Sequence, residues 1–288
     1  MIGDNMTDKI IDALFETEAI KMAPADHPFW YTSGMLGPFY CNTHFLLKSE
    51  QDAGDMLKVV EASIAEDKLT APKKIFEALK KYYDMGGTFK MTMDALAEEA
   101  KKYEFDFISG GERRDYFFSM LPAYLLGKPH LTIYKDMSSA YSEDLEGEAV
   151  VPTPEMLAGK KALHICDLIN TASSYERAWV PAIRGLGADI TDTLAVVDRC
   201  QGGADVLEGL GVKLKTLTKI NAEFFEDIYN NGKIDEAQKD FVLKYLSSPS
   251  EYMTHFLAAH PDFIAGELAK GGKSADRAKL AIEKGYAK

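Results

Sequence analysis

A carboxylate and a run of small hydroxylated residues stand close together in the middle of the chain, where they could bind an anion. Asp167 is followed by Thr171, Ser173 and Ser174. The first N–H groups of a helix lack partners within the helix, and the helix dipole favours negative charge at that end. If a helix begins at these residues, its start could bind an anion. An ordinary strand, turn and helix with a serine cap remains the alternative interpretation.

The elements that must position these residues are predicted from the stretch Ala162–Gly187. A short apolar run, closed by Asp167, indicates a strand that is covered on both faces. After the polar turn, apolar residues recur at helical spacing, and a glycine stands where the helix would end. The apolar helix residues are Trp179, Ile183 and Leu186.

Five short runs with strand character alternate with helical or looped stretches. They are FDFIS (105–109), HLTIY (130–134), ALHIC (162–166), TLAVV (193–197) and KLKTL (213–217). This alternation predicts an α/β fold with a parallel sheet and right-handed crossovers. Ligands of such sheets bind beyond the carboxyl ends of the strands. The polar residues that follow the strands are therefore candidates for a site, namely 110–114, 135–136, 167–174 and 198–199.

The flanking regions divide the chain into three predicted parts. Residues 1–104 are expected to form a helical cap, 105–220 the α/β core and 221–288 a helical extension. The expected helices of the first part are 7–22, 49–66 (with Ser49 as its cap), 72–83 and 93–103. Within that part, 27–45 is predicted to be a strand or loop hairpin because of its glycines, proline and aromatic residues. The long, acidic stretch 136–159 is expected to be a mobile lid, with disorder as the alternative.

Composition excludes several classes of function. The net charge of −12 argues against general nucleic-acid binding, which needs a basic face. No apolar run is long enough to span a membrane, and the N-terminal residues are too polar for a secretory signal. Three widely spaced cysteines, Cys41, Cys166 and Cys200, suggest reduced thiols in a cytoplasm and no thiolate metal site.

Three patches resemble the type I phosphoribosyltransferases, specifically the orotate phosphoribosyltransferase family. The first is the strand, acidic turn and phosphate loop at 162–174, and the second is the strand, Asp-Arg pair and glycine-rich helix at 195–220. The third is WYTSGMLGPFYCN, residues 30–42. The resemblance implies a Rossmann-like parallel sheet, a homodimer, and transfer of ribose 5-phosphate from phosphoribosyl pyrophosphate to a base, with Mg²⁺.

The resemblance also implies roles for individual residues. The acid at Asp167 would hold the ribose hydroxyls, while Arg113 and Lys135 would meet the pyrophosphate. Tyr40 would stack on the base, although such aromatic residues more often fill a core. Arg199 belongs to the matching Asp-Arg pair, for which an ion pair at the end of a strand is the alternative. The loop that would hold the 5′-phosphate consists of Asn170, Thr171, Ala172, Ser173 and Ser174. Surface ion pairs are an equally good interpretation of Arg113 and its neighbour Arg114.

Several positions depart from the family pattern. Cys166 stands where the family has its first acid, and Ala172 stands in place of a loop glycine. Ser138 and Ala140 stand near the places of a basic Lys and His in the family's mobile loop, and Thr32 replaces another Lys. These changes leave the acceptor base open.

Two other functions therefore stay open beside transfer. The same fold could bind a nucleotide monophosphate or a sugar phosphate as a regulatory protein without catalysis. Alternatively, Cys166 could act as the nucleophile of a hydrolase or lyase, since a thiol near a helix N-terminus can have a lowered pKa. A buried structural thiol is the more common role for such a residue.

Overall fold

The computed structural model describes residues 4–24 and 26–287, which form two compact units. We call the first the sheet unit; it holds the described residues up to Ala19 together with Asn42–Lys219. The second, the tail unit, holds Ile20–Cys41 and the described residues from Ile220 onward.

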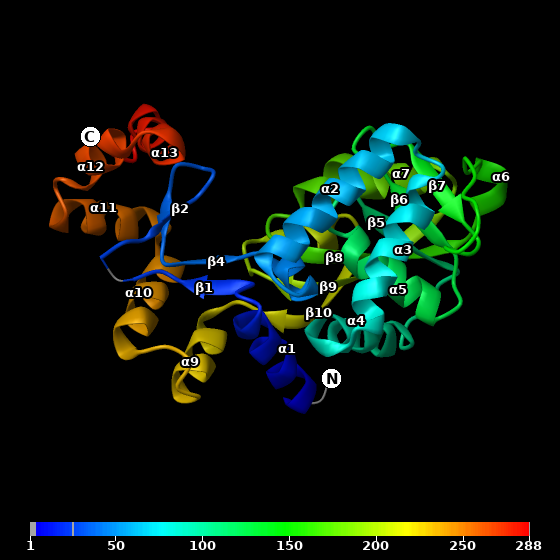
Figure 1. Cartoon of the computed structure of the whole chain (residues 1–288), viewed down its shortest axis with the longest axis horizontal. Coiled ribbons are helices and arrows are strands. Elements are labelled where there is room, and N and C mark those ends of the chain that lie inside the picture. Colours follow the sequence, from blue (N-terminus) through cyan, green and yellow to red (C-terminus); the bar gives the residue numbers. More distant parts are fainter. Residues whose placement is uncertain (1–3, 25, 288) are drawn as a thin grey trace. The chain divides into compact units, whose positions relative to one another are not determined.

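A six-stranded sheet forms the centre of the sheet unit (Figure 1). Neighbouring strands are parallel except for the last pair, β6 and β7, which is antiparallel. The predicted α/β fold with a parallel sheet is confirmed, and all five predicted runs are strands. In spatial order the strands are β10 (Lys213–Lys219), β9 (Asp189–Asp198), β8 (Lys161–Ile169), β5 (Phe107–Gly111), β6 (His130–Ile133) and β7 (Ser139–Ser142).

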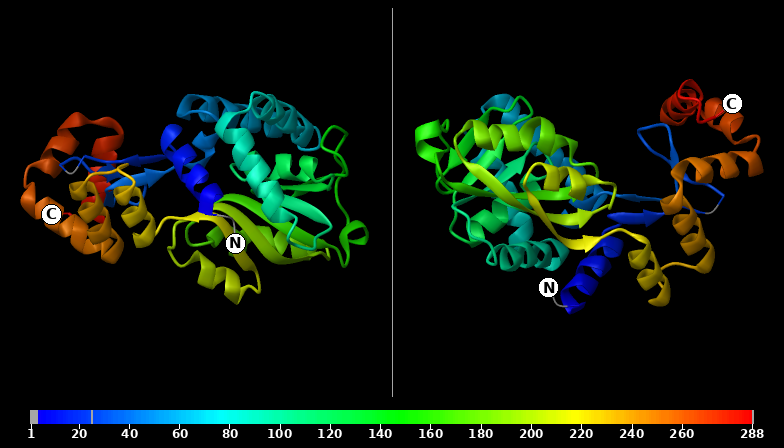
Figure 2. Two further views of the ribbon diagram at one scale, coloured as in Figure 1. Left: turned by 90° about the horizontal axis from the view of Figure 1, so that it is seen from below. Right: turned by 180° about the vertical axis from the view of Figure 1, so that it is seen from behind.

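Helices cover both faces of this sheet (Figure 2). On one face α5 (Tyr116–Leu125) packs on β5 and β8, α4 (Gly87–Ala100) contacts β9, and α1 (Asp4–Glu16) contacts β10. Outside them lie α2 (Glu50–Glu66) and α3 (Ala71–Asp84). The other face carries a π-helical turn, η2 (Tyr175–Trp179), which continues into α7 (Val180–Gly185), and α8 (Gly203–Gly209). Two short elements complete the unit, η1 (Thr43–Leu47) and α6 (Pro154–Leu157).

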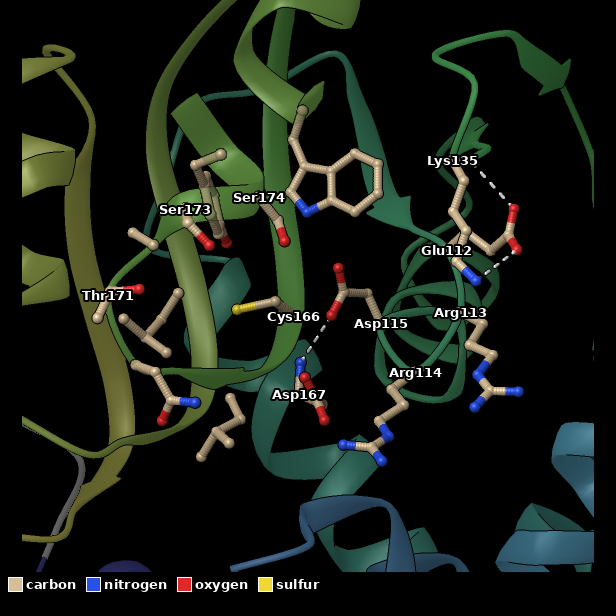
Figure 3. Close-up of a pocket in the computed structure, with 16 residues that line it drawn as sticks. Glu112, Arg113, Arg114, Asp115, Lys135, Cys166, Asp167, Thr171, Ser173 and Ser174 are labelled. Carbon is tan, nitrogen blue, oxygen red and sulfur yellow. Dashed lines mark hydrogen bonds and ion pairs between the residues drawn. The ribbon is translucent and has the colours of Figure 1, made fainter. Parts of the chain in front are cut away.

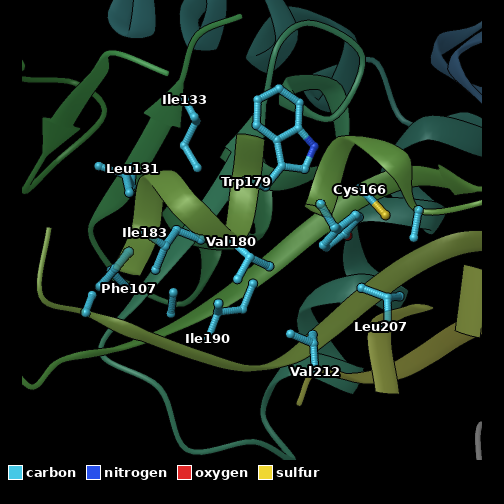
Figure 4. Packing of buried hydrophobic residues seen from close by; sticks show 14 of the residues in the cluster. Phe107, Leu131, Ile133, Cys166, Trp179, Val180, Ile183, Ile190, Leu207 and Val212 are labelled. Atoms are coloured by element: carbon cyan, nitrogen blue, oxygen red, sulfur yellow. The ribbon is translucent and has the colours of Figure 1, made fainter. Parts of the chain in front are cut away.

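The apolar core beneath η2 and α7 explains why this stretch folds against the sheet. Trp179, Val180 and Ile183 pack with strand residues such as Phe107 and Ile190, and all five are buried (Figure 4). The predicted strand, turn and helix are therefore present. The strand continues two residues past Asp167, however, to Ile169, because it goes on pairing with β9 up to Asp198.

The expectation for 136–159 is wrong in its first half. Ser139–Ser142 form strand β7 along the edge of the sheet, and Tyr141 pairs with Val150 through two backbone hydrogen bonds of 2.9 Å. Ala140 and Tyr141 are buried, so this segment belongs to the core although its sequence is polar. Whether the rest of the stretch moves as a lid stays a prediction.

The flanking helices follow the prediction with shifted ends. The cap of α2 is confirmed, since the Ser49 hydroxyl accepts a hydrogen bond of 3.1 Å from the Asp52 N–H. The first helix is shorter than expected and ends at Glu16, because Glu18 adopts a left-handed backbone with φ 54°. The helices α2–α4 belong to the same compact unit as the sheet. A separate functional role for residues 1–104 stays a prediction.

The tail unit joins two small hairpins to helices. Strand β2 (Phe29–Trp30) pairs with β3 (Leu36–Gly37), as the hairpin prediction for 27–45 expected. Strand β1 (Ile20–Met22) pairs with β4 (Phe39–Cys41), so the expectation that the first helix runs to residue 22 is wrong at its end. Phe39 packs against Phe225 and Tyr245, which ties the hairpins to the helices. The helices are α9 (Ala222–Asn230), α10 (Glu236–Ser247), α11 (Pro249–Ala259), α12 (Phe263–Lys270) and α13 (Gly272–Glu283). In the part of the chain that the structure describes, no helix has both the length and the apolar character that crossing a membrane requires.

Candidate active site at the carboxyl ends of the strands

A pocket of about 340 Å³ lies where strands β5, β6 and β8 end. Its lining comes from three segments, which are 112–115 after β5, Lys135 after β6, and 166–175 at the end of β8, with Trp179 beside them (Figure 3). The prediction that the polar residues after the strands meet at one edge is confirmed for these three segments. Of the predicted site residues, the pocket brings together Arg113, Lys135, Asp167 and the loop Asn170–Ser174.

The loop Asn170–Ser174 forms one side of the pocket and leads into the helical turn η2. Ala172 has a left-handed backbone with φ 52°, which is the conformation that a glycine adopts without strain. Helix α8 supports the loop from behind. A Cβ atom on Gly203 would lie only 2.5 Å from the carbonyl oxygen of Asn170, so the helix and the loop approach each other closely.

Asp167 lies at the floor of the pocket and is only 8% exposed. Its carboxylate accepts a hydrogen bond of 3.1 Å from the hydroxyl of Thr43. Burial, and then the neighbouring carboxylate of Asp115, raise the pKa of Asp167 to about 7, against the opposing effects of Arg114 and Thr43. Near neutral pH this group therefore exchanges easily between the acid and the carboxylate.

Asp115 is a second carboxylate at the floor that sequence reasoning missed. It stands at the start of α5. One of its carboxylate oxygens accepts a hydrogen bond from the backbone N–H of Asp167, and its other oxygen accepts one from the backbone N–H of Gly111, both at 3.2 Å. The ring of His164 lies behind it, with Nε2 at 3.5 Å from the carboxylate and Nδ1 at 2.9 Å from the Ser109 hydroxyl. Ser109 and His164 are fully buried, so this chain of groups cannot act as a nucleophilic triad and instead fixes Asp115.

Three cationic side chains form the opposite wall of the pocket, and they are Arg113, Arg114 and Lys135 (Figure 3). Arg113 makes an ion pair with Glu61 of α2, as one of its two interpretations expected, and it also lines the pocket. Its contact with pyrophosphate stays a prediction. Lys135 lies beside Glu112, with 3.7 Å between its ammonium group and the carboxylate. Arg114 is close enough to lower the pKa of Asp167. The sequence indicated Arg114 only as the neighbour of Arg113.

Cys166 cannot serve as the thiolate nucleophile considered from the sequence. The thiol is 2% exposed, and burial, followed by the charge of Asp115, raises its pKa well above the ordinary value. A protonated, buried thiol is a poor nucleophile. The expectation of a lowered pKa is therefore wrong, since burial and a nearby carboxylate outweigh the helix start.

Two predicted substrate contacts lie outside this pocket lining. Tyr40 belongs to β4 of the tail unit, where its ring packs against Phe29 with 4.8 Å between ring centroids. Arg199 follows β9, and its backbone N–H donates a hydrogen bond of 2.9 Å to the backbone carbonyl of Ile169. Stacking of Tyr40 on a base and a substrate contact of Arg199 stay predictions.

Comparison with known sequences gives phosphoribosyltransferases as relatives, although no family model matches. The chain is 29% identical to the orotate phosphoribosyltransferase of Sulfurisphaera tokodaii, over 58% of this chain and 80% of the relative. It is 35% identical to that of Saccharolobus solfataricus over 88 residues, which span 31% of this chain and 44% of the relative. An adenine phosphoribosyltransferase of Aeromonas salmonicida is 26% identical over 59% of this chain and 98% of its own length.

Solved structures share the fold of this chain at low sequence identity. The UMP synthase of Leishmania donovani aligns with a TM-score of 0.58 and 15% identity, over 85% of this chain and 43% of that one. The orotate phosphoribosyltransferase of Francisella tularensis aligns with a TM-score of 0.50 and 14% identity, over 82% of this chain and 96% of that one. The relatives are orotate and adenine phosphoribosyltransferases, the solved structures share the fold of this chain, and both findings support a type I phosphoribosyltransferase of the orotate type.

Proposed function

We propose that this protein is a phosphoribosyltransferase that moves ribose 5-phosphate from phosphoribosyl pyrophosphate to a nitrogen of a base. One observation carries the proposal. The loop that holds Thr171, Ser173 and Ser174 lies on one side of the pocket and the cationic side chains lie on the other, with the carboxylates of Asp115 and Asp167 between them (Figure 3). A sugar that carries a phosphate at one end and a diphosphate at the other fits this order of groups.

The reaction breaks the bond between the sugar C1 and the diphosphate oxygen and forms a bond between C1 and the base nitrogen. The sugar is cation-like during the transfer, so a site accelerates it by fixing the sugar and stabilising the leaving diphosphate. Here the hydroxyls and N–H groups of the loop would bind the 5′-phosphate. Arg114 and Lys135 would stabilise the charge that develops on the diphosphate, and the Asp167 carboxylate would face the sugar.

Mg²⁺ fits the pocket when the substrate supplies most of the ligands. The lining contains three carboxylates and three cationic side chains, so its formal charge is zero when all are ionised. A lining with no net charge attracts a diphosphate anion only weakly, through the positions of its cationic side chains. No three metal-binding side chains gather among the described residues, but Mg²⁺ is commonly held by one or two carboxylates together with substrate phosphates. Asp167 would contact the ion, which would supply additional positive charge beside the diphosphate.

The decisive experiment measures consumption of phosphoribosyl pyrophosphate with Mg²⁺ and a panel of bases that includes orotate and adenine. We expect turnover with at least one base. Arg114→Gln should weaken binding of phosphoribosyl pyrophosphate about tenfold or more, because it removes a charge-assisted contact, and should affect ribose 5-phosphate less. Absence of calorimetric binding to the wild-type protein, with and without Mg²⁺, would contradict the proposal.

A regulatory protein on the same fold is the second candidate function. Its support is the loss of the family's first acid at Cys166, and Ser138 and Ala140 where the family has basic residues. Binding of a nucleotide monophosphate without turnover of any base would select it. A homodimer and a cytoplasmic location are also part of the proposal, and light scattering across a range of protein concentrations tests the dimer.

A further inference from the structure

We propose that Asp115 supplies the second carboxylate that holds the vicinal hydroxyls of the sugar, in the role that Cys166 cannot fill. The inference rests on the proposed function and adds a substrate-binding residue to it. Asp115 is 52 residues away from Asp167 in the sequence, so no local motif contains the pair.

Asp115 and Asp167 are linked directly to each other. The carboxylate of Asp115 accepts the backbone N–H of Asp167 at 3.2 Å, which places the two residues side by side at the pocket floor. Each is 8% exposed, and both line the pocket. Cys166, which stands beside Asp167 in the sequence, offers only a buried and protonated thiol.

Asp115 keeps some of its hydrogen-bonding capacity for a ligand. An ionised carboxylate can accept about four hydrogen bonds. The described structure uses one for the Asp167 N–H and one for the Gly111 N–H, the carboxyl group of Asp167 also hydrogen-bonds to Asp115, and His164 approaches from behind. Figure 3 shows one carboxylate oxygen of Asp115 directed to the backbone of Asp167 and the other turned towards the side of Ser174. Room for hydroxyl donors therefore remains on the pocket side.

The two acids and the neighbouring loop together suit one chemical class of ligand. Two neighbouring carboxylates accept hydrogen bonds from two neighbouring hydroxyls, and hydrogen bonds to charged acceptors are stronger than neutral ones. The loop Asn170–Ser174 on the adjoining side suits a phosphate. A pentose phosphate with free vicinal hydroxyls satisfies both parts of the pocket, whereas a deoxypentose phosphate leaves one carboxylate without a partner.

The test compares ribose 5-phosphate with 2-deoxyribose 5-phosphate by titration calorimetry, in the full chain. Wild-type protein should prefer ribose 5-phosphate. In Asp115→Asn, which keeps the size of the side chain, affinity for ribose 5-phosphate should fall about tenfold or more, and the preference over the deoxy sugar should shrink. Asp106→Asn is the matched control, because Asp106 is an exposed aspartate outside the pocket lining, and it should leave both the affinity and the preference unchanged.

Three results would separate the possible failures. The wild type could bind both sugar phosphates, with Asp115→Asn lowering the affinity for both by the same factor. Asp115 would then only support the loop, and this inference would be wrong while the proposed function stands. If the wild type binds no sugar phosphate, both fail. Should Asp115→Asn not fold, a crystal structure of the wild type with ribose 5-phosphate decides the question. It overturns the inference if no hydroxyl of the sugar lies within hydrogen-bond distance of Asp115.

Discussion

Thr43 donates a hydrogen bond of 3.1 Å to the carboxylate of Asp167, although 124 residues separate the two in the sequence. Thr43 is fully buried in η1, and η1 packs against β8. The hydrogen bond stabilises the ionised form of Asp167 and so opposes the increase in pKa that burial causes. A segment outside the α/β core thus contributes to the charge state at the floor of the pocket.

Replacing Thr43 with Val should weaken binding of phosphoribosyl pyrophosphate most strongly near neutral pH. Loss of the hydrogen bond raises the pKa of Asp167 further above about 7, so less of it is ionised at that pH. We expect affinity to fall roughly tenfold at neutral pH and to recover partly at more alkaline pH. Calorimetry over this pH range measures the effect. Thr92→Val is the control, because Thr92 is equally buried but donates its hydrogen bond to Thr88 within α4. An equal, pH-independent loss in both variants would show that Thr43 acts only through stability.

Asp167→Asn should make the protein more stable at neutral and alkaline pH while it weakens substrate binding. An aspartate in the unfolded chain has a pKa of about 3.9, whereas that of folded Asp167 is raised to about 7. The folded state therefore holds a proton that the unfolded state has lost. The contribution of Asp167 to the free energy of unfolding is therefore present in acid. It is lost as pH rises from about 3.9, the pKa in the unfolded chain, to about 7, the pKa in the folded protein.

Urea unfolding of the wild type and Asp167→Asn across this pH range checks the sign. The stability of the variant relative to the wild type should rise by roughly 2–4 kcal/mol between acid and alkaline conditions. Asp106→Asn is a useful comparison, because Asp106 is an exposed aspartate at the other end of β5. A difference between wild type and Asp167→Asn that does not change with pH would mean that folding does not raise the pKa of Asp167.

The sequence predicted the sheet and the edge at which the site lies, because both follow from local patterns. Apolar runs determine strands, and the polar residues after β5, β6 and β8 lie at the same edge of a parallel sheet. Asp115 and Thr43 were missed because each acts through a contact with Asp167 across a long stretch of chain. Strand β7 was missed because its pairing with β6 overrides a polar sequence.

Ala172→Gly should leave the protein as stable as the wild type or slightly more stable. Ala172 has φ 52°, a left-handed conformation that costs a non-glycine residue roughly 1–2 kcal/mol. Glycine removes this strain, but it also gives the unfolded chain more conformational freedom, which offsets about 0.4–1 kcal/mol of the gain in stability. Ala182→Gly, inside helix α7, is the control and should cost about 1 kcal/mol. Thermal unfolding of both variants tests the contrast, and a large loss of stability in Ala172→Gly would show that its methyl group is needed for packing.

Helix α8 packs closely against the loop Asn170–Ser174, so two of its glycines should respond differently to substitution by alanine. A Cβ on Gly203 would lie 2.5 Å from both the Asn170 carbonyl oxygen and a methyl group of Ile169, whereas a Cβ on Gly209 would meet nothing within 4 Å. Gly203→Ala must therefore displace the loop, and such overpacking costs about 1–3 kcal/mol.

We expect Gly203→Ala to lower stability and to weaken binding of inorganic phosphate severalfold, because the N–H groups and hydroxyls of Asn170–Ser174 move with the loop. Gly209→Ala should be neutral or more stable by up to about 1 kcal/mol, since alanine favours the helix, and should bind phosphate as the wild type does. Phosphate binding measured by calorimetry, beside thermal unfolding, separates the two effects. Loss of stability in Gly203→Ala with unchanged phosphate affinity would mean that the loop does not hold the anion, and the site proposed for the 5′-phosphate would have to lie elsewhere in the pocket.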